Sequence, residues 1–96
     1  MITYTYEAKF ALNTLSPQDQ LRIREIETKL DCPLEELVAS GFVKKMEMPG
    51  DLFLARAGDS LRVIFEPTTE GARILDIVRH ERLVEFHRAL HAGAEA

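Results

Sequence analysis

The first residues of the chain alternate between large apolar or aromatic side chains and threonine. Ile2, Tyr4 and Tyr6 occupy every second position, with Thr3 and Thr5 between them. A period of two among β-branched and aromatic residues is typical of a strand that buries one face. The pattern therefore predicts that the chain begins with a strand over these five residues.

A helical hairpin is predicted to follow this strand. A short apolar run through residues 10–12 precedes Ser16 and Pro17, which suit the N-cap and the first position of a new helix. From Pro17 to about Leu30, apolar residues recur at helical spacing and charged residues occupy the other faces, which indicates an amphipathic helix. One or two further helical turns are expected over residues 34–39.

The pattern changes after Gly41, where four short runs read as strands. Segments rich in Gly, Pro, Asp, Ser and Thr separate these runs, and connections this short join only antiparallel neighbours. We therefore expect an antiparallel meander of three to four strands. The predicted strands are Phe42–Met48, Leu52–Ala57, Leu61–Glu66 and Arg73–Val78.

The last periodic segment, residues 80–91, places Leu83, Phe86 and Leu90 on one helical stripe. This pattern predicts a C-terminal helix that packs on the sheet or on a partner. The order of strand, two-helix hairpin, β-meander and C-terminal helix makes the fold class α+β. With 96 residues, the chain forms a single domain over residues 1–96 with one modest core, which a partner chain would help to complete.

The charge balance counts against binding of RNA or DNA. Sixteen Asp and Glu against twelve Lys and Arg give a net charge of −4, whereas nucleic-acid-binding proteins usually carry a basic face. The excess of acid is uneven, because residues 1–42 carry four basic and seven acidic side chains while residues 43–96 carry eight and nine. A local basic surface is therefore compatible with the second half of the chain.

The single cysteine and the absence of long apolar runs bear on the compartment. Cys32 has no partner for an internal disulfide, which fits a reducing environment, and we read it as a small buried side chain beside Pro33. No segment approaches the roughly 18 apolar residues of a membrane span. We therefore expect a cytoplasmic protein that does not bind a membrane.

Three segments carry a family likeness. Residues 51–65, DLFLARAGDSLRVIF, resemble the "lyrlRvGdyRviy" stretch of RelE/ParE-type toxins, which belong to type II toxin–antitoxin systems. Residues 74–82 look like the last strand of that family running into its "hR" segment, and residues 43–46 look like its "kkL". The likeness follows the order of elements along nearly the whole chain, although only about thirty residues carry motifs.

The resemblance implies a site for RNA cleavage. Nuclease members of the family cleave by attack of the ribose 2′-oxygen, so the site must move protons and stabilise charge on the phosphate. Arg62 matches the sheet arginine of the motif, and a guanidinium stays charged and offers forked donors. It could equally pair across the sheet with Glu66 or Asp76. His80 is the candidate general acid or base, since an unperturbed imidazole has a pKa of about 6.5. The alternative is a surface histidine at a helix start.

The resemblance further implies supporting residues and partners. Arg56, Arg82, Lys44 and Lys45 would bind RNA or phosphate, although each also fits a solvated surface charge. No cofactor or metal is expected. The expected partners are a cognate antitoxin, the ribosome and its messenger RNA, in a homodimer or a toxin–antitoxin hetero-oligomer. The function implied is that of a RelE-like, ribosome-dependent endoribonuclease that inhibits translation.

Two departures from the family pattern, together with the acidic charge balance, favour a second function. Phe86 stands where many nuclease members carry a tyrosine, and residues 52–55 lack the lysines found on the corresponding strand of some members. A non-enzymatic protein on the same fold is therefore the alternative: a ParE-like inhibitor of DNA gyrase or an inactive antitoxin-binding relative. His80, His87 and His91 share a helical stripe, but no carboxylate or cysteine joins them there to complete a metal site.

Overall fold

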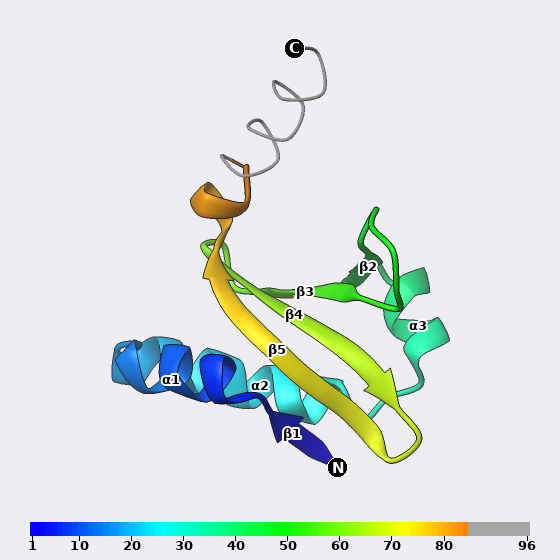
Figure 1. Cartoon of the computed structure of the whole chain (residues 1–96), viewed down its shortest axis with the longest axis horizontal. Helices are drawn as coiled ribbons and strands as arrows, with labels where there is room; N and C mark the ends of the chain where they lie inside the picture. The colour runs from blue at the N-terminus through cyan, green and yellow to red at the C-terminus, as the bar shows by residue number, and fades with distance from the viewer. Residues whose placement is uncertain (85–96) are drawn as a thin grey trace.

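The computed structural model describes residues 1–84 and has the predicted α+β architecture (Figure 1). Residues 80–84 begin a further helix after the last strand. Phe86, His87, Leu90 and His91, for which roles were expected, lie outside the described residues. The elements in chain order are β1 (Ile2–Tyr4), α1 (Tyr6–Thr14), α2 (Pro17–Lys29), α3 (Leu34–Ala39), β2 (Val43–Lys45), β3 (Phe53–Ala57), β4 (Leu61–Thr68) and β5 (Gly71–Arg79).

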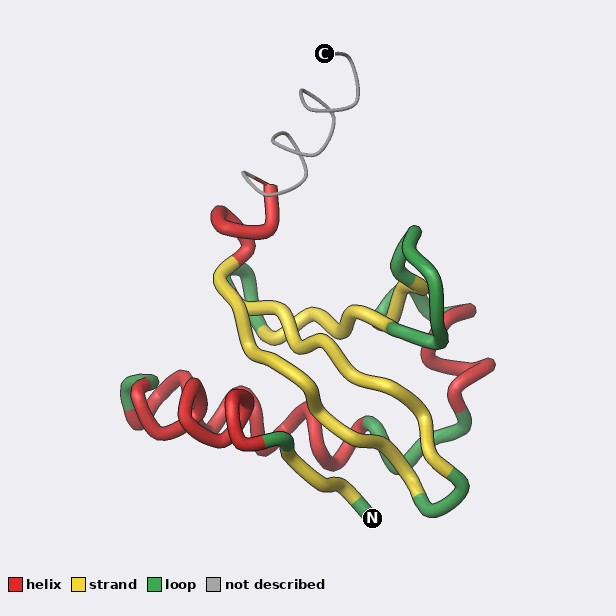
Figure 2. Tube along the Cα trace, viewed as in Figure 1, coloured by secondary structure: helices red, strands yellow, loops and turns green. Residues whose placement is uncertain are grey.

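The five strands form one mixed sheet in the order β1-β5-β4-β3-β2 (Figure 2). Strands β2 to β5 are the predicted antiparallel meander, because each pairs with its neighbour in the chain. Strand β1 lies parallel to β5 at the edge, with Ile2 opposite Ala72. A parallel pair needs a long crossover, and here α1 to β4 supply it.

The first strand ends two residues earlier than predicted, and Tyr6 begins α1 instead. Thr5 is the N-cap: its side-chain oxygen accepts a hydrogen bond from the Ala8 amide at 3.1 Å. The same hydroxyl donates to the Leu75 carbonyl at 2.8 Å, which ties the start of the helix to β5. The alternation of residues 2–6 was misleading because Thr is both a strand former and a cap, and the Tyr6 side chain is 84% exposed.

The two faces of the sheet differ. Helices α1 and α2 lie along one face (Figure 1), and alternate strand residues such as Ala55, Val63 and Ile77 are buried there. The predicted stripe of α2 is confirmed, because Ile23, Ile26 and Leu30 all lie in this core. We call the other face the open face. Its residues alternate with the core residues, and they are Lys44, Leu54, Arg56, Arg62, Ile64, Glu66, Arg73 and Val78.

The segment between α2 and α3 corrects one expectation from the sequence. Cys32 is exposed and does not fill the core, because Pro33 turns the chain at the surface. It lines a cavity of about 260 Å³ between the end of α2 and the β4–β5 hairpin, together with Asp31, Phe65 and Glu70. Among residues 1–84, no helix is long and apolar enough to cross a membrane.

Candidate phosphate-binding site

The turn between β3 and β4 places two arginines side by side. Gly58 adopts a φ of +68°, a left-handed conformation that glycine reaches without the strain a side chain would add. The tight turn sets the register of the hairpin so that Arg56 and Arg62 are direct cross-strand partners. Both lie on the open face, and like charges in this position repel one another.

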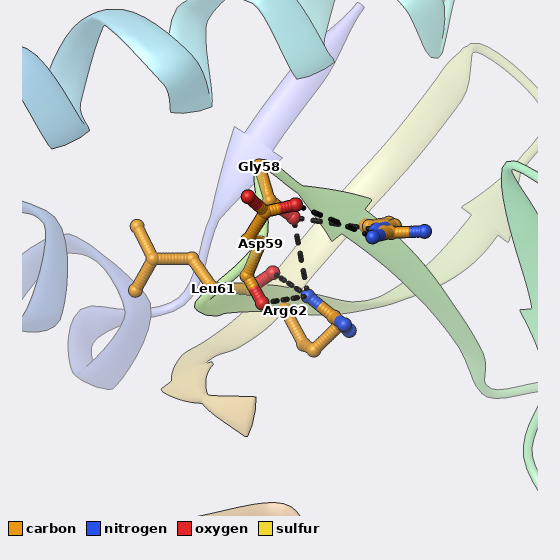
Figure 3. A network of polar contacts seen from close by, with 5 residues as sticks. Gly58, Asp59, Leu61 and Arg62 are labelled. Atoms are coloured by element: carbon orange, nitrogen blue, oxygen red, sulfur yellow. Dashed lines mark hydrogen bonds and ion pairs between the residues drawn. The ribbon is translucent and has the colours of Figure 1, made fainter. Parts of the chain in front are cut away.

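Arg62 is held by the backbone of this turn (Figure 3). Its Nη1 donates to the carbonyl oxygens of Leu61 at 2.7 Å and Gly58 at 3.3 Å, and lies 3.5 Å from that of Asp59. The cross-strand ion pairs considered from the sequence are absent: Glu66 pairs with Arg73, and the Asp76 carboxylate accepts from the Ile77 amide at 2.8 Å. Arg62 is therefore fixed by neutral acceptors.

The electrostatics of the turn favour an anion. Partial burial and the neighbouring Arg56 guanidinium lower the pKa of Arg62, against an opposing effect of Asp59. Asp59 pairs with Arg56 at 3.4 Å, but its side chain is fully exposed, so water screens its charge. Among residues 1–84, no carboxylate forms an ion pair with Arg62. An anion bound here would relieve the repulsion between the two guanidiniums.

The end of β5 lies against the same turn. The backbone N–H of His80 donates to the Ser60 carbonyl at 2.7 Å, and the strand residue two positions earlier, Val78, is the cross-strand partner of Arg62. His80 and Arg82 are exposed and lie in the helical segment that starts at residue 80. The fold therefore brings His80 and Arg82 to the end of the sheet that carries Arg56 and Arg62.

The two lysines of β2 lie on opposite sides of the sheet. Lys44 is opposite Leu54 on the open face, one strand away from Arg56. Lys45 pairs with Phe53, a core residue, so strand alternation directs it to the other side of the sheet. The structure therefore places Lys44, but not Lys45, on the open face with the arginine pair.

Two further arginines lie beside the β3–β4 turn and were not singled out from the sequence. Arg22 of α2 packs against Gly58, with its Nη1 2.6 Å from the position that a Cβ on that glycine would take. Arg79 is the cross-strand partner of Leu61, beside the same turn. No motif could have pointed to Arg22, because only the packing of α2 on β3 brings it there. Arg79 could have been found from its place directly before His80.

Comparison with known proteins bears on the fold. No protein-family model matches the chain, and no curated protein sequence matches it significantly. The archaeal RelE-RelB complex from Pyrococcus horikoshii contains a chain that is 28% identical, with a TM-score of 0.64, covering 84% of this chain and 94% of that one.

Two further solved structures are similar in fold. The RelBE2 toxin–antitoxin complex of Mycobacterium tuberculosis matches at 19% identity and a TM-score of 0.62, covering 83% of this chain and 96% of that one. The RelB-RelE antitoxin–toxin complex of Methanococcus jannaschii matches at 13% identity and a TM-score of 0.61, with coverages of 88% and 96%. The likeness detected in the sequence is thereby confirmed, and the chain has the fold of RelE-type toxins.

Proposed function

We propose that this protein is the toxin of a toxin–antitoxin pair and acts as a ribosome-dependent messenger RNA endoribonuclease. The observation that carries the proposal is the cross-strand pair Arg56 and Arg62 at the turn beside His80. Backbone carbonyls hold Arg62, while Arg56 contacts the Gly58 carbonyl and the exposed Asp59 carboxylate. A paired, preorganised set of guanidiniums is suited to a phosphate, because each offers forked donors with a fixed charge. The global charge of −4 does not prevent this, since three arginines, Arg56, Arg62 and Arg79, lie at one end of the sheet.

Each side chain has a role in the proposed reaction. The 2′-oxygen of the ribose attacks phosphorus while its proton is removed, the bond to the 5′-oxygen breaks, and that oxygen receives a proton. Arg62 stabilises the charge that develops on the phosphate oxygens. His80 exchanges a proton with the attacking or the leaving oxygen. Arg56, Arg82 and Lys44 hold the RNA backbone, whereas Lys45 has a lesser part because it lies off the open face.

The proposed partner in the resting state is a small antitoxin. The three similar structures are complexes of RelE-type chains with RelB chains. In this protein Tyr6 and Phe10, one helical turn apart on α1, are 84% and 65% exposed, and Leu21 of α2 is 62% exposed. Large apolar side chains exposed together mark interaction surfaces. We expect the antitoxin to cover them, and the protein to work in the cytoplasm, where ribosomes are found.

A second function is favoured by one feature of β3. Leu54 lies on the open face between Lys44 and Ile64, where a nuclease would gain from another cation. An apolar centre of the open face suits a protein partner as well as it suits RNA. The alternative is therefore a protein that binds gyrase or only its antitoxin, with no cleavage.

Induced expression in bacterial cells separates these functions. We would follow growth and map cuts in a translated messenger by primer extension for the wild type, Arg62→Ala and His80→Ala. Arg73→Ala is the matched control, because Arg73 also lies on the open face but pairs with Glu66 away from the turn. Arrest with cuts, lost in the first two variants and kept in the control, supports the nuclease. Arrest without cuts would support gyrase inhibition, and no arrest an inactive binder.

A further inference from the structure

Gly58 is contacted from two sides by arginines of different elements. Its carbonyl oxygen accepts from Arg56 Nε at 3.4 Å and from Arg62 Nη1 at 3.3 Å. On its other side lies the Arg22 side chain of α2, with Cδ and Cζ 3.2 and 3.3 Å from the position that a Cβ would take. The absence of a side chain at residue 58 is what lets the third guanidinium approach. Three cations from α2, β3 and β4 thus meet at one residue.

The charge on Arg22 is not neutralised by the protein within the described residues. The ion pairs among residues 1–84 are Arg56 with Asp59 and Arg73 with Glu66, and neither includes Arg22. Arg22 is half-buried, so its charge is less screened than that of an extended surface arginine. The carboxylate at this turn, Asp59, pairs with Arg56 and is fully exposed, so it leaves the charge of Arg22 available to a bound anion.

We propose that Arg22 is a third phosphate-binding residue of this site, so that an RNA backbone bound at Arg56 and Arg62 continues over the Gly58 turn onto α2. This inference rests on the proposed function, because it extends the RNA site of the open face around the edge of the hairpin. The inference gives α2 a direct part in substrate binding, in addition to the packing of its buried residues in the core. The substrate class is single-stranded RNA contacted through its phosphates.

The same helix provides a matched control. Arg24 is two residues from Arg22 and therefore faces a different side of α2. It lies near Tyr4, where burial and then Glu27 raise the pKa of the tyrosine and the charge of Arg24 acts against them. Replacing Arg24 removes the same charge from the same helix without touching the turn. Any difference between the two variants therefore reports position and not net charge.

The test is the salt dependence of RNA binding. Affinity of the full-length protein for a labelled single-stranded RNA oligonucleotide would be measured by fluorescence anisotropy over a range of salt concentrations. Each phosphate contact contributes about 0.7 to the slope of log affinity against log salt for a single strand. We expect Arg22→Ala to lower the slope by about 0.7 and the affinity severalfold, Arg22→Lys to restore most of the slope, and Arg24→Ala to leave it unchanged.

Two results would overturn the inference. One is an Arg22→Ala slope equal to that of the wild type, even with weaker binding, because Arg22 would then only support the turn. The other is an equal loss of slope in Arg24→Ala, which would mean a general effect of charge. Arg62→Ala distinguishes the inference from the proposed function. If Arg62→Ala also leaves the salt slope unchanged, the proposed RNA site itself is wrong. If Arg62→Ala lowers the slope and Arg22→Ala does not, the RNA site stands and only the role of Arg22 is wrong. Thermal unfolding of each variant shows that it is folded.

Discussion

The two ends of β4 are both closed by glycine-containing turns, yet they are built for different purposes. At the β3–β4 turn, Gly58 is packed against the flexible side chain of Arg22 and carries arginine donors on its carbonyl. At the β4–β5 turn, Gly71 is packed against the backbone of Met1, whose amino group donates to the Glu70 carbonyl. Gly58 allows arginine side chains to approach one another, and Gly71 allows β1 to pair with the sheet.

The contrast separates a binding surface from a structural joint. Around Gly58 the acceptors for Arg62 are backbone carbonyls, and the only carboxylate paired there among residues 1–84 is the exposed Asp59, so donors that could bind a ligand are left available. Around Gly71 the contacts are main chain to main chain, with Ala72 N–H donating to Met1 O at 3.2 Å. Rigid contacts tolerate less change than flexible ones, and the following predictions use that difference.

Gly71→Ala should have the largest effect on stability. A Cβ would overlap the Met1 backbone, and a φ of +151° strains any residue with a side chain. We expect the free energy of unfolding to fall by about 3 kcal/mol, near the upper end for single substitutions, because β1 would leave the sheet. Urea denaturation measures it. Gly50→Ala is the control, since Gly50 also has a positive φ but has no atom within 4 Å of the added Cβ; an equal loss in both would show that only backbone strain matters.

Gly58→Ala should destabilise less, by about 1–2 kcal/mol, which is the cost of a left-handed conformation for alanine. The added Cβ meets Arg22 Nη1 at 2.6 Å, but a long side chain can move away. RNA binding should nevertheless weaken, because the displaced guanidinium leaves the turn. The same denaturation and anisotropy measurements apply. A loss of stability as large as that of Gly71→Ala would mean that Arg22 is as rigid as the Met1 backbone.

Tyr4→Phe should reduce stability by about 1 kcal/mol at neutral pH, because the Tyr4 hydroxyl donates to the Glu27 carboxylate and fastens β1 to α2. Burial, and then the hydrogen bond and charge of Glu27, raise the pKa of Tyr4 above its usual 10.0. The unfolded chain therefore loses the tyrosine proton first, and stability should fall as the pH rises beyond about 10. Unfolding curves from pH 8 to 11 test this; a fall just as steep in Tyr4→Phe would contradict it.

Replacing Arg73 by Ala should have the smallest effect, under about 0.5 kcal/mol. Its pair with Glu66 spans 3.4 Å, and the two side chains are 52% and 37% exposed. Water and salt therefore screen most of the attraction. Thermal unfolding at low and high salt measures it. A cost above 1 kcal/mol would show that this ion pair helps to hold β4 to β5.

Periodicity predicted most of the fold, because burial on one face leaves a pattern in the chain. The stripe of α2 and the short helix over residues 34–39 were both correct, and so was the order of the four meander strands. Two errors have local causes. Tyr6 continued the alternation of β1 while Thr5 used its hydroxyl as a helix cap, and Cys32 was assigned to the core although the turn before Pro33 exposes it.

The candidate site could be predicted only in part. Arg56, Arg62 and His80 lie in the segments that resemble the family motifs. The β3–β4 hairpin pairs the two arginines, and the pairing of β4 with β5 brings His80 to the same end. The partner of Arg62 was not predictable, because backbone carbonyls leave no mark in the sequence. Arg22 and Gly58 are 36 positions apart along the chain, and only tertiary packing brings them into contact. Lys44 and Lys45 are adjacent in the chain, and strand alternation separates them.

The most direct test of the proposed cleavage site is a single-turnover assay with purified protein on ribosomes carrying a defined messenger. Arg62→Ala should lower the rate of cleavage by at least about a hundredfold, as expected when a donor to the transition state is removed. Arg73→Ala should cleave at the wild-type rate, with both variants folded. Cleavage by Arg62→Ala at a rate near that of the wild type would contradict the assignment of the turn between β3 and β4 as the catalytic end of the molecule.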